Sequence, residues 1–365
     1  MQEIPYKNIL LLINLFFMIM LMNSALAFNA FKFAVIADPH LSVPGPHSPV
    51  NGVKMFKNSV ELLQATVDAI NQVGDIDFVV VLGDLTKDAE PWNVDRFKEV
   101  MDELNMPWYV ILGNHDISPV DTQATDREPG VTRATIISTF QGHGFNGTQP
   151  NWSLDPLPGI HLIGLDSILT GDWGGRINRH GLNFLKQDLT AHADKLTIVI
   201  LHHQLQIYTP AEQTGENGFD KFVLYNANAV KAILKQHPQV IMTLSGHRHL
   251  STRYLQEDHI AYFTMASTVT WPMRYTIFAV DPKQITYNTY DVPCNPKVRE
   301  EARQNTLAVD TKTFPRTQAT PNTPQGNQQL LDTISSEETK SGKLSLLFQP
   351  DKLLDNKVGN ADFRE

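Results

Sequence analysis

An amide, an imidazole and a carboxylate follow one another at residues 114–116, directly after the apolar run 108–112. Such a run is typical of a buried strand, and Gly113 allows the backbone to turn sharply at its end. Taken alone, the pattern is as consistent with a polar turn as with a functional site. Four further apolar runs of this sequence end in Asp or His in the same way. This repetition indicates one shared site.

The residues at these strand ends could hold metal ions. An isolated Asp in such a position often caps a helix, and an isolated His is more often hydrogen-bonded than bound to metal. Clustered carboxylates repel one another without a counter-charge, which a divalent cation would supply. The spacings Asp-x-His and His-x-His also put two side chains on the same side of an extended segment. The strand-end groups are Asp38, His40, Asp84, Asn114, His115, His202, His247 and His249.

The ligand types narrow the choice of metal. Oxygen and nitrogen ligands without thiolate suit Fe, Mn, Zn or Co. Cys294 is the only cysteine, which excludes an intrachain disulfide and a cysteine-based zinc site. Two ions that share a carboxylate are the usual arrangement for phosphate-ester chemistry, in which they activate a water molecule and bind the phosphoryl oxygens.

Apolar runs and helical spacing predict the elements that position these residues. Strands are expected at 31–37, 78–82, 108–112, 160–165, 197–201 and 240–244, with shorter ones at 261–266, 275–280 and 285–290. Helices are expected at 55–71, 94–104, 131–140, 182–189 and 227–236. This alternation predicts a mostly parallel, layered α/β sheet, in which ligand sites gather at the carboxyl ends of the strands.

The five blocks resemble those of the calcineurin-like metallophosphoesterases, and they occur in family order between residue 31 and about residue 290. They read Asp38-x-His40, Gly83-Asp84, Gly113-Asn114-His115-Asp116, His202 and Gly246-His247-x-His249. The resemblance implies a four-layer αββα sandwich, with two mixed β-sheets flanked by helices. The expected fold is therefore this sandwich of two mixed sheets, in place of the single, mostly parallel sheet that the periodicity predicts.

The resemblance also implies a role for each residue. One ion would be held by Asp38, His40 and His249, the other by Asn114, His202 and His247, and Asp84 would bridge them. His115 would act on the leaving group as proton donor, and Asp116 would orient it. Relatives often have Pro two residues after the ligand His, where this chain has Gln204. His203 is therefore an alternative to His202, which directly follows the strand.

The resemblance implies a hydrolase in which a metal-bridging hydroxide attacks a phosphate ester. The segments 165–167 and 271–275 look most like those of exported or bacterial cyclic-nucleotide and glycerophosphodiester phosphodiesterases. A phosphomonoesterase of the acid phosphatase or nucleotidase type is the alternative. A non-catalytic exported binding protein is a further alternative, as is a serine hydrolase using Ser167, although no Gly-x-Ser-x-Gly elbow surrounds it. Loops 41–53, 117–130 and 205–225 are expected to shape the pocket.

The net charge and the two ends of the chain lead to expectations about binding partners, export and domain boundaries. The net charge of −9 argues against a broad basic surface for nucleic acid. Residues 1–27 are expected to be a signal peptide, because the apolar run 9–22 follows Lys7 and precedes Ala25-Leu26-Ala27. The protein would then be secreted or periplasmic, without a membrane span after cleavage; an uncleaved anchor is the alternative. We expect a catalytic domain at 28–293 and a polar, flexible tail at 294–365.

Overall fold

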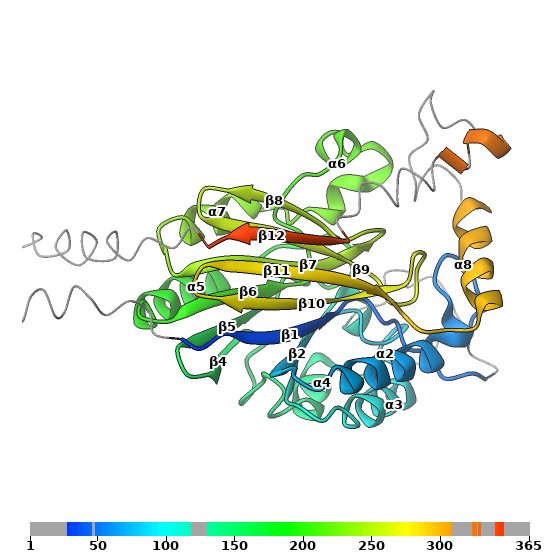
Figure 1. The fold of residues 1–365 in the computed structure, drawn as a ribbon, viewed down its shortest axis with the longest axis horizontal. Helices are drawn as coiled ribbons and strands as arrows, with labels where there is room; N and C mark the ends of the chain where they lie inside the picture. Colours follow the sequence, from blue (N-terminus) through cyan, green and yellow to red (C-terminus); the bar gives the residue numbers. More distant parts are fainter. Residues whose placement is uncertain are drawn as a thin grey trace, which may run out of the picture.

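Two six-stranded sheets lie face to face in the computed structural model, with helices outside them (Figure 1). The structure describes residues 28–45, 48–117, 130–308, 323–326, 328–329 and 340–346. The expected signal peptide and most of the expected tail lie outside these residues. None of the helices in the described part of the chain has the length and apolar character of a membrane span.

The first sheet is mixed. β1 runs parallel to β2 and β2 to β3, whereas β10, β11 and β12 are joined to β1 by antiparallel pairings. Its spatial order is β12 (Ser341–Ser345), β11 (Gln284–Asp291), β10 (Arg274–Asp281), β1 (Phe31–Ile36), β2 (Phe78–Leu82) and β3 (Trp108–Ile111). The three parallel strands point their carboxyl ends toward one edge, where the first three sequence blocks follow.

The second sheet has a parallel centre and antiparallel edges. Its spatial order is β4 (Trp152–Leu157), β5 (Ile160–Leu165), β6 (Leu196–Leu201), β7 (Val240–His249), β9 (Ile260–Ala266) and β8 (Arg253–Glu257). The remaining two sequence blocks follow β6 and end β7. The antiparallel pairings of both sheets show that the mostly parallel sheet expected from periodicity is wrong, and that the two mixed sheets implied by the resemblance are correct.

Helices cover the outer face of each sheet. The first group comprises α2 (Ser59–Val73), α3 (Pro91–Met101) and α4 (Arg133–Thr139), and the second comprises α5 (Arg179–Ala191) and α7 (Ala227–Leu234). β6 is apolar except for Thr197, because Ile198 and Ile200 belong to the core between the sheets, whereas Val199 and Leu201 belong to the cluster formed with α5 and α7. A strand buried on both faces loses polar alternation.

Several elements lie outside the expected ones. β4 and β8 were not expected, and neither were the short α6 (Pro210–Thr214) and the 3-10 turns η2 (Asn114–Asp116) and η3 (Glu216–Phe222). The helix expected at 55–71 begins with the 3-10 turn η1 (Phe56–Asn58) and continues as α2. Beyond residue 293 the structure contains α8 (Pro296–Ala308), and β12 pairs with β11 along residues 284–288. Two segments of the expected tail therefore have regular structure, and one of them extends the first sheet.

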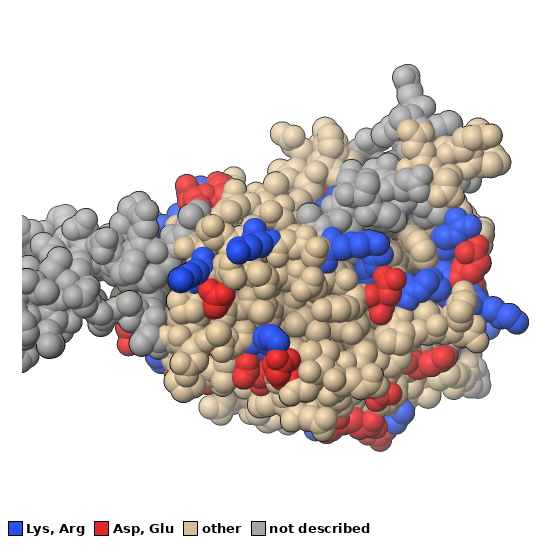
Figure 2. Space-filling model, viewed as in Figure 1, with Lys and Arg blue, Asp and Glu red and all other residues tan. Residues whose placement is uncertain are grey.

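Charged side chains of both signs are interspersed on the face shown in Figure 2, over a largely uncharged surface. Basic residues on this face do not form a continuous area, and red and blue groups lie next to one another. The pairs that the structure records include Lys195 with Asp155 and Arg303 with Glu300. Mixed charge of this kind is typical of a solvated surface.

Candidate metal centre

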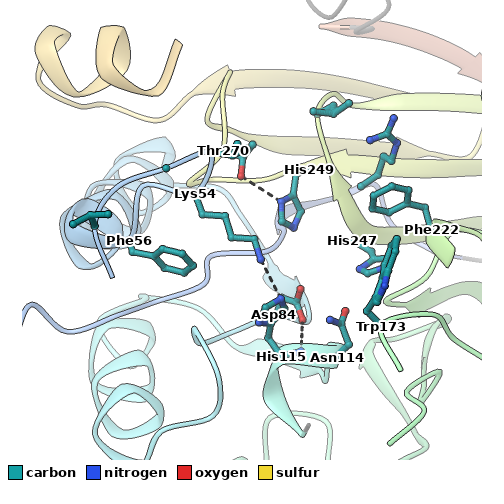
Figure 3. A pocket seen from close by; sticks show the side chains of 15 residues that line it. Lys54, Phe56, Asp84, Asn114, His115, Trp173, Phe222, His247, His249 and Thr270 are labelled. Carbon is teal, nitrogen blue, oxygen red and sulfur yellow. Dashed lines mark hydrogen bonds between the residues drawn. The ribbon is translucent and has the colours of Figure 1, made fainter. Parts of the chain in front are cut away.

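The carboxyl ends of strands from both sheets meet at one place and bring the predicted ligands together (Figure 3). Asp38 and His40 follow β1, Asp84 follows β2, and Asn114 begins η2 after β3. From the second sheet, His202 follows β6, and His247 and His249 lie at the end of β7. Residues that are up to 211 positions apart in the chain (38 to 249) thus converge.

The ligand atoms form two sets that share one carboxylate. In the first set, the Nε2 atoms of His40 and His249 lie 3.2 Å apart, and His40 Nε2 lies 3.3 Å from Asp84 Oδ2. The Nε2 atom of His249 also lies 3.5 Å from Asp38 Oδ1. Asp84 is the residue that this set has in common with the other.

The second set is centred on His202. Its Nε2 atom lies 3.1 Å from Asn114 Oδ1, 3.1 Å from His247 Nδ1 and 3.5 Å from Asp84 Oδ2. Its Nδ1 atom donates a hydrogen bond to the carbonyl of Leu82 at 2.8 Å, so Nε2 is the ring atom directed into the cluster. A ring fixed in this way is ready to bind a metal.

These spacings fit bound metal ions. Ligand atoms at about 2.1 Å from one ion are separated by roughly 3.0 to 3.4 Å in octahedral or tetrahedral geometry. The distances of 3.1–3.5 Å within each set are close to that range. The ring nitrogens of His40 and His249, and those of His202 and His247, face one another at distances that a bound ion would also accommodate. All seven predicted ligands therefore lie where two ions could be held.

Backbone strain supports a functional interpretation of the cluster. Five of the seven predicted ligands have a positive φ, between 38° and 68°: Asp38, His40, Asp84, His247 and His249. This conformation is uncommon for non-glycine residues and is concentrated at functional sites. Glycine permits the close approach of the loops: a Cβ on Gly113 would overlap the backbone nitrogen of Asp84, and one on Gly246 would lie 2.6 Å from Asp38 Oδ2.

The electrostatics keep the imidazoles available as ligands. Burial lowers the pKa of His40, His247 and His249, so these rings stay neutral at physiological pH. Burial also lowers the pKa of His202, but the carboxylates of Asp84 and Asp38 outweigh it and raise this pKa to about 9. The metal-free site therefore carries a proton on His202 that an ion would displace.

The structure distinguishes His202 from His203. The Nε2 atom of His203 donates to the carbonyl of Trp173 at 3.1 Å, so its Nδ1 accepts from the Ser167 hydroxyl at 2.7 Å. Ser167 is fully buried, and neither residue lines the cavity. This geometry places His202, and not His203, in the group of side chains that could hold a metal ion. It gives Ser167 no access to a substrate, against the serine hydrolase alternative.

His115 reaches the cavity, but Asp116 does not hold it. The Nδ1 atom of His115 donates to the carbonyl of Lys87 at 2.7 Å and to Asp88 Oδ1 at 3.0 Å, so Nε2 faces the cavity. The carboxylate of Asp116 instead accepts hydrogen bonds from three buried backbone amides, those of Leu85, Thr86 and Gly113. The expected role of Asp116 in orienting His115 is therefore wrong. The Asp116 carboxylate instead links the turn after β2 to the turn after β3. Asp88 is the carboxylate that bonds the ring of His115.

A cavity of about 490 Å³ opens over the cluster. Trp173 and Phe222 form one wall next to His247, with ring centroids 5.9 Å and 5.2 Å from its imidazole. Lys54 and Phe56 lie on the opposite side (Figure 3). The cavity is lined from the expected loops 41–53 and 205–225, whereas residues 118–129 of the third loop lie outside the described residues.

Sequence reasoning missed Lys54, Asp88, Trp173 and Phe222. None of them directly follows an apolar strand, which was the criterion used to find the ligands. Trp173 lies in the loop before α5, and Phe222 ends η3. The aromatic residues within the polar insertion 205–225 were the one indication that this loop could contribute a wall of the cavity.

A separate cluster of His161, Asp188 and His192 also has the composition of a metal site. The ring of His161 is buried and bonds two carboxylates, Asp155 through Nδ1 at 2.7 Å and Asp188 through Nε2 at 2.6 Å. His192 stacks on it with centroids 4.0 Å apart. These hydrogen bonds satisfy the buried ring without a metal, so the cluster joins β5 to α5 as a structural contact.

Comparison with known proteins places the chain among phosphoesterases. The chain is 24% identical to the 3',5'-cyclic adenosine monophosphate phosphodiesterase CpdA of Haemophilus influenzae, over 75% of this chain and 89% of the relative. It is 25% identical to a probable glycerophosphodiester phosphodiesterase GpdQ of Arcobacter nitrofigilis, over 59% of this chain and 70% of that protein.

Solved structures agree on the fold. A dimetal phosphatase from Danio rerio superposes with a TM-score of 0.56 at 15% identity, covering 73% of this chain and 98% of that one. The purple acid phosphatase PPD1 from yellow lupin gives 0.55 at 13% identity, covering 80% and 57%. Residues 31–251 match the family model of the calcineurin-like phosphoesterases, a span that contains all five sequence blocks. The chain therefore belongs to the calcineurin-like phosphoesterase family.

Proposed function

We propose that the protein is a phosphodiesterase that works with two metal ions. The observation that carries this proposal is the pair of ligand sets sharing Asp84, three to four side chains each, at the floor of an open cavity. When bound, the two ions would supply Lewis acidity toward the phosphoryl group and an activated water molecule. The residues fit Fe, Mn, Zn or Co, because all ligands are nitrogen or oxygen.

The chain's own residues supply the remaining chemistry. His115 presents Nε2 to the cavity while Lys87 and Asp88 hold Nδ1, and this orientation suits a proton donor to the leaving oxygen. Asp84 also accepts a hydrogen bond from the His115 backbone amide at 2.9 Å, which couples the position of this donor to the shared ligand. Movement of the Asp84 turn would therefore disturb both functions.

The cavity favours a diester with a planar substituent. The Trp173 and Phe222 rings lie 5.3 Å apart beside His247 and present aromatic surface to anything bound over the metal cluster. A nucleobase stacks well on such rings, whereas a glycerol substituent has no ring to stack. This observation supports a cyclic nucleotide over a glycerophosphodiester, in line with the name of the Haemophilus relative. A monoester without a ring, like a glycerol substituent, would not stack on this wall.

The substrate class is tested with the metal-loaded full chain and a panel of esters. We expect hydrolysis of cyclic AMP to exceed that of glycerophosphocholine and p-nitrophenyl phosphate, and a chelator to abolish all three. Preference for p-nitrophenyl phosphate would instead favour the phosphomonoesterase. Absence of turnover in a protein shown to contain its metals would favour a non-catalytic binding protein.

We also propose that the protein is exported. The apolar run 9–22 and the Ala25-Leu26-Ala27 segment support this proposal. Fractionation of cells expressing the full chain, with sequencing of the mature amino terminus, tests it. A product beginning near residue 28 outside the cytoplasm is expected, and an uncleaved cytoplasmic protein would contradict the proposal.

A further inference from the structure

We propose that Lys54 is a further catalytic residue, whose ammonium group binds a non-bridging oxygen of the substrate's phosphoryl group. This inference rests on the proposed phosphoesterase function and assigns a residue that lies outside the five sequence blocks. Lys54 lines the cavity and extends from its side wall toward Asp84 and His115 (Figure 3).

The backbone of Lys54 is fixed against the segment that supports a predicted ligand. Lys54 forms a β-bridge with Thr270, and the next amide, that of Met55, donates to the carbonyl of Val269 at 2.9 Å. The side chain of Met55 is fully buried, so this point of the chain cannot shift freely. Thr270 lies 3.3 Å from His249 Nδ1 through its hydroxyl. The segment 269–270 therefore contacts both the backbone at Lys54 and the predicted ligand His249, and so fixes their relative positions.

The ammonium group has hydrogen-bonding capacity left for a ligand. Its Nζ atom lies 3.1 Å from Nε2 of His115, and within the described residues this ring is its one side-chain hydrogen-bond partner. An ammonium carries three N–H donors, so two stay directed at the cavity. Among the same residues, no carboxylate lies within the 4.0 Å that defines an ion pair with Lys54. The carboxylates of Asp84, Asp38 and Asp88 act on the charge of Lys54 without forming an ion pair with it.

A phosphoryl group suits this position. In the substrate-free geometry Nε2 of His115 accepts from Lys54. When Nε2 instead carries the proton for the leaving oxygen, the ammonium group 3.1 Å away no longer donates to it and can reach another oxygen on the same phosphorus. Lysine binds phosphate oxygens as a compact point charge. The other nearby cation, Arg248, has its guanidinium held by Glu212 at 3.0 Å and stacked on Phe222 at 4.6 Å. Lys54 is the basic residue whose charged end faces the cavity floor beside His115.

The test compares Lys54→Met with Lys57→Met in the metal-loaded full chain. Lys57 is three residues away and exposed, so its replacement removes the same charge from the same turn without touching the cavity. The measurements are bound metal per chain, the affinity for inorganic phosphate by calorimetry, and kcat/KM for a phosphodiester. Lys54→Arg and Lys54→Gln provide a second pair, because arginine keeps the charge and glutamine does not.

We expect Lys54→Met and Lys54→Gln to weaken phosphate binding by about tenfold or more, since a charge-assisted contact is lost. The value of kcat/KM should fall by about 100-fold, which is typical of the removal of one donor to a phosphoryl or acyl oxyanion. Bound metal should be unchanged. Lys57→Met should match the wild type, and Lys54→Arg should recover part of the phosphate affinity.

Two results would overturn the inference. One is phosphate affinity and kcat/KM within twofold of wild type in both uncharged variants. The other is a parallel loss of bound metal, because Lys54 would then act on the ligands and not on the substrate. Failure of the proposed function is a different outcome: the metal-loaded wild type would hydrolyse no ester, while loss of phosphate binding in Lys54→Met would still support the site.

Discussion

Replacing Asp88 with alanine should slow hydrolysis without unfolding the protein, because Asp88 holds the ring of His115. The carboxylate accepts from His115 Nδ1 at 3.0 Å, and the carbonyl of Lys87 accepts from the same atom at 2.7 Å. Removal of Asp88 leaves the second contact in place. The ring should keep its tautomer while losing one of the two partners that fix its orientation.

The magnitude follows from these contacts. A hydrogen bond to a charged group contributes about 1.5–3 kcal/mol, and each 1.36 kcal/mol corresponds to a tenfold change in rate. Asp88→Ala should therefore reduce kcat by roughly 10- to 150-fold. Asp88→Asn keeps an acceptor without the charge and should lose about half of that free energy. His115→Ala removes the proton donor itself and should cost about 10²- to 10⁴-fold.

Asp116→Asn is the matched comparison, because Asp116 follows His115 directly in the sequence but bonds backbone amides and not the imidazole ring. Asp116 is fully buried and accepts from the amides of Leu85, Thr86 and Gly113. An asparagine amide would turn a donor toward one of them and cost about 1–3 kcal/mol. This corresponds to a fall in Tm of roughly 3–10 °C.

The assay measures kcat against pH and thermal unfolding for both variants, with metal content checked in each. We expect the pH profile and kcat to change in Asp88→Ala at constant Tm, and Tm to fall in Asp116→Asn. The reasoning is refuted if Asp88→Ala retains full kcat and pH dependence while Asp116→Asn alone alters both, since Asp116 would then orient His115.

Three further predictions concern the metal cluster and the wall of the cavity. Asp84→Asn should leave about one bound ion or fewer per chain, because both ligand sets lose their shared carboxylate; elemental analysis showing two ions would argue against sharing. Trp173→Ala should raise KM for cyclic AMP by roughly tenfold through loss of stacking, with little change for glycerophosphocholine; equal changes for both esters would contradict the stacking role. Because the pKa of His202 is raised to about 9 without metal, that imidazole is protonated at pH 7–8 and must release its proton to bind an ion. Calorimetry of metal uptake in buffers of different ionisation enthalpy should detect this proton, and apparent metal affinity should fall with decreasing pH; buffer-independent heats would show that His202 is already neutral.

The sequence predicted the elements that follow simple periodicity. β2 is apolar throughout, and β5 and β6 are apolar except for His161, Gly164 and Thr197, because both faces of these strands are buried. Their positions were therefore found to within one or two residues. β12 was missed for the opposite reason: its sequence Ser-Gly-Lys-Leu-Ser is polar, and Leu344 is its one buried residue. An edge strand is defined by its pairing partner, here β11, which periodicity does not reveal.

The ligands were predictable because each follows a strand, where parallel topology brings distant residues together. The residues around them were not. Asp88 reaches His115 through the path of the loop after β2, and Lys54 reaches it through a bridge to Thr270. The role that the resemblance implied for Asp116 was wrong because the η2 turn directs its carboxylate toward backbone amides and away from the ring of His115.

Anomalous diffraction from crystals of the metal-loaded full chain would test the central claim most directly. The account predicts two ions on either side of the Asp84 carboxylate: one among Asp38, His40 and His249, the other among Asn114, His202 and His247. A single ion, or ions bound elsewhere with Asp84 uncoordinated, would contradict it.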